Sequence, residues 1–181
     1  MLTPTMAGRE THRLTIRAAD ESHAGEVARV VNAAYAIGEA GLWLEGNSRT
    51  TAAAVAESLD EMLVATEDGR VVGCARVQPI DATTADLGLI SVEPEHWGGG
   101  VGRRLVRAAE ERMRAAGVRT VQLEVLVPRE GVHPEKVKLR AWYERLGYEV
   151  VRTARFEEIA VHPASDLAVP CEFLVFQRSI G

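Results

Sequence analysis

The sequence has little cysteine: Cys74 and Cys171 are the only two among 181 residues. They are not spaced as Cys-x-x-Cys, the arrangement typical of zinc sites, and two cysteines cannot form the dense framework of a disulfide-stabilised domain. Each lies in a strand-like run with apolar neighbours. We therefore expect two small core residues rather than nucleophiles, and we predict no metal site.

Long apolar runs and an excess of basic residues are also missing. No window approaches the roughly 20 apolar residues of a membrane span, and residues 1–13 lack the apolar core and cleavage site of a signal peptide. The 21 Lys and Arg against 26 Asp and Glu give a net charge of -5, which argues against a binder of nucleic-acid backbones. We expect a cytoplasmic protein with no nucleic-acid or membrane partner.

What is present is a succession of strand-like and helix-like segments without repeats or low-complexity tracts, which predicts a flexible tail at 1–13 and one domain at 14–181. Helices are expected after a cap at Asp20 or Ser22, after a cap at Thr50 or Thr51, before Gly117 and before Gly147. The Asp68-Gly69 turn predicts an antiparallel hairpin. Strands are expected at 14–17, 62–65, 71–77, 86–92, 118–127, 148–156 and 173–176. The pattern predicts a mixed sheet flanked by helices.

Two connections stand out by composition. Segment 38–49 has three glycines around Trp43 and Leu44, which favours a mobile lid over packed structure. The connection around Pro163 and Pro170 is expected to be a surface excursion.

A glycine-rich turn lies between the strand at 86–92 and the helix that follows it. Glycine lets bare backbone approach a ligand, and the unpaired amides and dipole of a helix N-terminus favour an anion. We expect a phosphate here, although a turn that simply connects two elements is the alternative. The residues predicted to bind it are Gly98, Gly99, Gly100, Val101, Gly102 and Arg103, with charge added by Arg103 or Arg104.

Two common phosphate motifs do not fit this turn. A P-loop requires Lys followed by Ser or Thr after the glycines, and neither pair occurs. A dinucleotide fingerprint requires Gly or Ala where Arg103 or Leu105 stands.

The turn instead resembles the cofactor motif of the GNAT superfamily of N-acetyltransferases, Val-x-Pro-Glu, two residues, then Gln/Arg-x-x-Gly-x-Gly/Ala. The matching residues are Val92, Pro94, Glu95, Gly100, Val101 and Gly102. Trp97 stands at the Gln/Arg position, so the backbone is expected to form the cradle. The order of elements over 14–178 is also similar to that of the family.

This resemblance implies a GNAT-like α/β (α+β) fold, a mixed and mostly antiparallel sheet of about seven strands whose fourth and fifth strands splay apart. It implies acetyl-CoA (coenzyme A) as the cofactor, with the pantetheine arm bound through the backbone of Ile90, Ser91 and Val92. Lys138 replaces a family asparagine near the cofactor, so a contact there is expected to be altered.

Acetyl transfer to an amine requires proton movement, because an amine with a pKa of about 10.4 is mostly protonated at neutral pH. A base must remove a proton, and a donor to the departing thiolate helps. Tyr143 resembles the family's general acid, with a core aromatic as the alternative. Glu124 resembles the base of ribosomal-protein N-terminal acetyltransferases, and Asp86, our second choice, matches the base position of histone-type relatives. For each carboxylate, a plain solvated group is the alternative.

The acceptor pocket is expected at Trp43, Leu44 and Glu45, with help from loop 129–136 and Asp166. Acidic residues there, including Glu39, suit a cationic amine, but an acidic protein also scatters carboxylates over its surface. We expect a small amine or an amino-acid-like substrate, with a protein N-terminus or lysine as the alternative. A non-catalytic acyl-CoA sensor, a structural role and a homodimer stay open.

Overall fold

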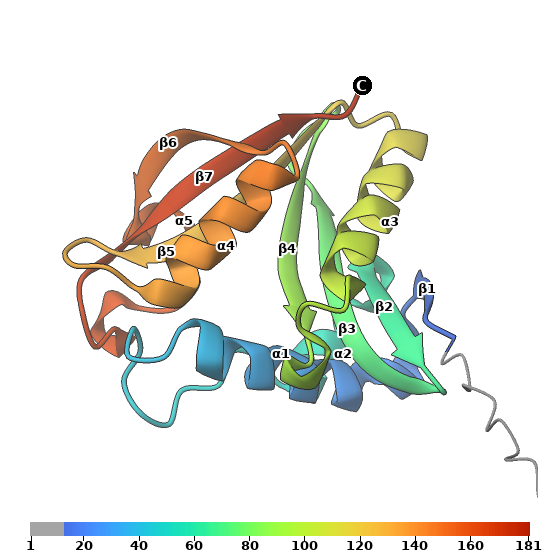
Figure 1. Cartoon of the computed structure of the whole chain (residues 1–181), viewed down its shortest axis with the longest axis horizontal. Coiled ribbons are helices and arrows are strands. Elements are labelled where there is room, and N and C mark those ends of the chain that lie inside the picture. The colour runs from blue at the N-terminus through green and yellow to red at the C-terminus, as the bar shows by residue number, and fades with distance from the viewer. Residues whose placement is uncertain (1–12) are drawn as a thin grey trace, which may run out of the picture.

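A seven-stranded sheet organises the computed structural model, which describes residues 13–181 (Figure 1). The strands lie in the order β1-β2-β3-β4-β5-β7-β6, and all neighbours are antiparallel except β4 and β5. They are β1 (Thr15–Ala18), β2 (Met62–Glu67), β3 (Arg70–Pro79), β4 (Thr84–Val92), β5 (Thr120–Pro128), β6 (Glu149–Arg155) and β7 (Cys171–Ser179). This confirms the predicted mixed, mostly antiparallel sheet.

The helices are α1 (Ala24–Gly38), α2 (Ala52–Ala56), α3 (Val101–Ala115), α4 (Pro134–Arg145) and α5 (Phe156–Ile159). As predicted, Asp20 caps the turn that leads into α1, and Thr51 caps α2 by accepting from the Ala54 amide. The predicted tail at 1–13 lies outside the described residues apart from Arg13. No helix within residues 13–181 combines the length and the apolar character needed to cross a membrane.

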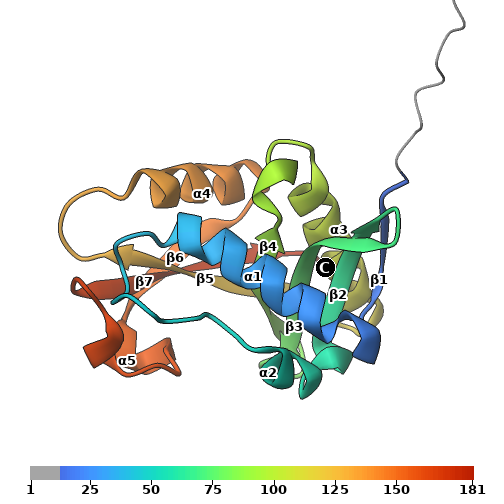
Figure 2. The same cartoon turned by 90° about the horizontal axis from the view of Figure 1, so that it is seen from below.

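The helices cover both faces of the sheet, α3 and α4 one face and α1 and α2 the other (Figure 2). Successive side chains of a strand point to opposite faces. On β5, Leu123 and Val125 join the core beneath α3 and α4, so Glu124 between them faces the α1 side. On β4, Ala85 and Leu87 join the same core, so Asp86 also faces the α1 side.

Strands β4 and β5 separate soon after they meet. Their parallel pairing covers three residue pairs and ends at Asp86 opposite Gln122. Beyond that point a bulge interrupts β4 on its other edge, where the register with β3 is irregular and Leu89 has a φ of 48°. A bulge bends its strand, which turns the end of β4 away from β5. The predicted splay of the fourth and fifth strands is confirmed, and Figure 1 shows α1 crossing below it.

The segment between α1 and α2 is packed in part, so the prediction of an unpacked lid is wrong for its first half. Leu42 is 2% exposed, and Trp43 forms a β-bridge with Leu167 and lies 5.8 Å, ring centre to ring centre, from Phe156. The connection between β6 and β7 folds back, partly as α5, and supplies these apolar partners. Leu44 stays exposed.

Both cysteines are buried free thiols. Burial raises the pKa of Cys74 to about 12 and that of Cys171 to about 11, so both thiols are protonated at neutral pH. The prediction of two core residues is confirmed.

Candidate functional site

Two carboxylates meet on the α1 face, where β4 and β5 begin to diverge. Burial, followed by the nearby Glu124 carboxylate, raises the pKa of Asp86 to about 8, while the Arg76 guanidinium opposes the shift. The Oδ1 atom of Asp86 is buried and has no hydrogen-bond partner among the described residues. Two acids this close do not ionise independently. The structure therefore brings together the two residues that the sequence offered as separate candidates for the base.

Glu124 is oriented by a short chain of amides. Gln177 Nε2 on β7 donates to Gln122 Oε1 at 3.0 Å, and Gln122 Nε2 donates to Glu124 Oε1 at 2.7 Å. A donated hydrogen bond favours the ionised form of a carboxylate. Within the pair, Glu124 is the better placed to carry the negative charge, and Asp86 to carry the proton.

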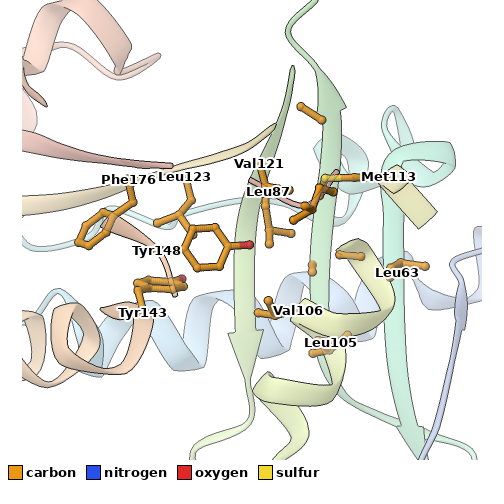
Figure 3. Close-up of a cluster of buried hydrophobic side chains, with 14 of the residues drawn as sticks. Leu63, Leu87, Leu105, Val106, Met113, Val121, Leu123, Tyr143, Tyr148 and Phe176 are labelled. Atoms are coloured by element: carbon orange, nitrogen blue, oxygen red, sulfur yellow. The ribbon is translucent and has the colours of Figure 1, made fainter. Parts of the chain in front are cut away.

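Tyr143 reaches the same region from the opposite face of the sheet. It lies on α4, is 6% exposed, and its ring centre is 5.9 Å from that of Tyr148 and 5.8 Å from that of Phe176. Figure 3 shows Tyr143 and Tyr148 together, with their rings pointing towards β4. Burial raises the pKa of Tyr143, and Tyr35 and Asp86 raise it further.

The Tyr143 hydroxyl has no hydrogen-bond partner among residues 13–181. Because its raised pKa keeps it protonated, this hydroxyl is a donor available to a bound molecule. Tyr143 is thus a core aromatic, and its role as a proton donor stays a prediction.

The glycine turn at the start of α3 presents bare amides. Gly98 and Gly100 have φ values of 79° and 83°, and the space beside each α-carbon is open, so glycine is required by conformation and leaves room for a ligand. Among the described residues, no acceptor pairs with the amides of Val101, Gly102 or Arg103, and the first turn of α3 has no acidic residue. This arrangement fits a phosphate group.

Gly99 differs from the other glycines of the turn. Its amide donates to the His96 carbonyl at 3.1 Å, so it is not free for a ligand. Trp97, 44% exposed, donates from Nε1 to the Val92 carbonyl at 2.7 Å and so ties the turn to the end of β4. Next to that carbonyl, the Ser91 hydroxyl is buried without a hydrogen-bond partner in the described part of the chain, and Ile90 lies in the bulge.

The three basic residues predicted near the cofactor differ in the contacts that their side chains make. Arg103 is exposed and pairs with no described residue. Arg104 donates to the Leu14 carbonyl at 2.9 Å, and Lys138, 71% exposed, pairs with Glu135 at 2.7 Å. Arg103 is therefore the basic side chain with the fewest competing contacts.

A buried ion pair connects Glu39, the residue directly after α1, to Lys136 on α4. Lys136 Nζ lies 2.9 Å from Glu39 Oε1, and the two side chains are 7% and 6% exposed. The other oxygen of Glu39 accepts from Trp43 Nε1 at 2.6 Å. Glu39 is thus already neutralised, and it does not offer the free charge to a cationic amine that the sequence suggested.

A cavity of about 390 Å³ lies between α1 and the segment that follows it. The predicted acceptor residues Trp43, Leu44 and Glu45 all line it, together with Tyr35 and Arg49. Asp166 does not line it, but its carbonyl accepts from the Leu44 amide at 2.9 Å.

Sequence reasoning missed Tyr35, Arg76 and Gln122, and it included Lys136 only as part of loop 129–136, because no local motif marks the contacts that these residues make in the fold. The alternation along β5 was the one available indication, since it places Gln122 on the same face as Glu124.

Comparison with known proteins gives the family of the chain. Residues 30–148 match the model of the acetyltransferase (GNAT) family, which confirms the resemblance predicted from the glycine turn. The amino-acid acetyltransferase of Pseudomonas syringae pv. syringae is 33% identical over 64 residues, which cover 35% of this chain and 15% of that protein. The chain thus matches about 15% of the length of that curated relative.

Two solved structures show the same fold. The ribosomal-protein-S18-alanine N-acetyltransferase from Escherichia coli superposes with a TM-score of 0.68 at 19% identity, covering 93% of this chain and 95% of that one. An aminoglycoside 6'-N-acetyltransferase complexed with coenzyme A gives a TM-score of 0.71 at 17% identity, covering 92% of this chain and 97% of that one.

Proposed function

Because this chain belongs to the acetyltransferase (GNAT) family, we propose that it transfers the acetyl group of acetyl-CoA directly to the primary amine of a small molecule. The observation that supports this proposal is the early separation of β4 and β5, with the Asp86 and Glu124 pair on the α1 face of these strands and the buried Tyr143 on α4 at the other face. Cofactor and acceptor then approach the opening from opposite faces of the sheet.

The turn at the start of α3 holds the diphosphate of the cofactor. The amides of Val101, Gly102 and Arg103 donate to its oxygens, and the Arg103 guanidinium adds charge. The backbone of Ile90 and Ser91, next to the bulge, binds the pantetheine arm. When bound, acetyl-CoA supplies the acetyl thioester.

Glu124 is the base. Asp86 keeps its proton below a pH of about 8, so at neutral pH the pair carries one proton and one negative charge, and the Gln122 amide favours the charge on Glu124. Glu124 takes a proton from the ammonium group of the acceptor, directly or through a water molecule, and the amine becomes nucleophilic.

Tyr143 is the acid. Its hydroxyl keeps its proton at all physiological pH values and donates it to the sulfur of the departing coenzyme A. The buried aromatic neighbours fix the ring, so little ordering is needed during the reaction.

Release of free thiol from acetyl-CoA, measured over a panel of amines, amino acids, aminoglycosides and peptides, tests the proposal. Tyr143→Phe and Glu124→Gln are each expected to lower kcat by about 10²- to 10⁴-fold while leaving the Kd for acetyl-CoA within about twofold. Glu144→Gln, on the exposed side of α4, is the matched control and should retain full turnover.

Two outcomes would contradict the proposal. Full turnover in both variants would remove the two residues from the mechanism. Binding of acetyl-CoA, seen as a rise in Tm, without transfer to any amine of the panel would favour a sensor instead.

A further inference from the structure

Arg49 has an unpaired charge in the cavity beside α1. Its guanidinium lies over the ring of Tyr35, 4.8 Å from the ring centre, and Arg49 is half-buried. No carboxylate of the described residues lies within ion-pair distance of it. Of the two acidic residues that line the same cavity, Glu39 is already paired with Lys136, and Glu45 is exposed at the rim.

The backbone at Arg49 is held in place by α1. Asn32 Oδ1 accepts from the amides of Arg49 and Thr50 at 2.8 and 3.1 Å, and Asn32 Nδ2 donates to the Thr50 carbonyl at 2.9 Å. Three hydrogen bonds from one side chain fix the start of the arginine side chain, and stacking on Tyr35 restrains its end. A guanidinium positioned before binding loses less entropy when it takes a planar anion.

The cavity lies on the side of the sheet that the two carboxylates face. Tyr35 and Arg49 line this cavity of about 390 Å³, and Tyr35 belongs to α1. Asp86 on β4 and Glu124 on β5 point to the α1 side of the sheet. An acceptor in the cavity therefore has the Arg49 guanidinium beside it and shares this side of the sheet with the carboxylate pair.

We propose that Arg49 binds a carboxylate of the acceptor, so that the substrate class is a small amine that also carries a carboxylate. The guanidinium fork pairs with both oxygens of the carboxylate, and this contact directs the amine of the same molecule towards Glu124. The proposal rests on the proposed acetyl transfer and adds to it the residue that selects the substrate.

The test compares amino acids, with the amine at different distances from the carboxylate, against the corresponding carboxamides. For the best pair, the wild type is expected to favour the carboxylate over the carboxamide in kcat/KM by about 10- to 100-fold. Arg49→Met should abolish that preference, leaving kcat/KM for the carboxamide and KM for acetyl-CoA within about twofold. Arg107→Met, which removes an exposed guanidinium on α3, should keep the full preference.

A wild type without the preference, or an Arg49→Met variant that loses activity equally on both members of the pair, would overturn the proposal. Arg49→Lys keeps the positive charge but lacks the guanidinium fork. A preference between those of the wild type and Arg49→Met supports the proposal. The Lys variant replaces the Met variant in the test if the Met variant does not fold. If the wild type acetylates no amine, the proposed acetyl transfer is wrong. Calorimetry then measures whether the complex with coenzyme A binds the carboxylate or the carboxamide of each pair, and this tests the proposed role of Arg49 by itself. Carboxylate-selective binding that Arg49→Met abolishes supports the site, and its absence overturns it.

Discussion

The ion pair between Lys136 and Glu39 leads to a sharp prediction about stability. Both side chains are at least nine-tenths buried, and their charged atoms are 2.9 Å apart. Lys136→Met fills a similar volume but leaves the Glu39 carboxylate with the Trp43 indole as its one remaining described partner. Breaking a buried pair from one side costs about 3 to 5 kcal/mol. This is at least about a fifth of the roughly 5 to 15 kcal/mol that stabilise a typical domain.

Lys138→Met provides the matched control, because Lys138 lies on α4 like Lys136 and pairs with a glutamate, Glu135, but is 71% exposed. It should cost less than about 0.5 kcal/mol. Removing both buried charges with Glu39→Gln and Lys136→Met together should recover most of the loss, because the neutral amide still accepts from Trp43. Urea unfolding followed by circular dichroism measures all three. Equal free energies of unfolding for Lys136→Met and Lys138→Met would refute the reasoning.

Two further predictions concern the reacting pair and the glycine turn. Folding raises the pKa of Asp86 from about 3.9 to about 8, so the folded state binds more protons in that window and its stability falls as pH rises through it. Between pH 5 and 7, the free energy of unfolding of Asp86→Asn relative to that of the wild type should therefore rise by up to about 1.4 kcal/mol per pH unit. Urea unfolding measures this difference, and parallel pH profiles of the two proteins would contradict the prediction. Gly100→Glu should weaken acetyl-CoA binding at least about tenfold by calorimetry, through positive φ and charge at the cradle. Gly117→Glu, at a φ of 88° beyond the other end of α3, should leave acetyl-CoA binding unchanged. Equal losses of affinity in the two variants would mean that backbone strain, and not the cradle, weakens binding.

Local patterns predicted most of the fold. The Asp68-Gly69 turn, the cap at Thr51 and the glycines after α3 and α4 each act within a few residues, so the chain reveals them directly. The bulge at Leu89 was not predicted, because nothing marks a leucine for a φ of 48°. Its cause is the pairing with β3, which spans more than ten residues of chain.

The candidate site was likewise predictable in part from local sequence patterns. The glycine turn, Tyr143 and Glu124 lie in short motifs, and Asp86 lies at the start of a predicted strand, so the sequence alone could offer them as candidates. Their proximity could not be predicted, because the approach of Asp86 to Glu124 depends on the register of β4 and β5, which sets Asp86 opposite Gln122. Glu39 looked like a free surface carboxylate because Lys136, its partner, is 97 residues away in the chain.

A crystal structure with coenzyme A tests the central claim most directly. We predict the diphosphate oxygens within hydrogen-bond distance of the Val101, Gly102 and Arg103 amides, and the sulfur next to the Tyr143 hydroxyl at the opening between β4 and β5. A diphosphate bound elsewhere, or a sulfur remote from Tyr143, would contradict the account.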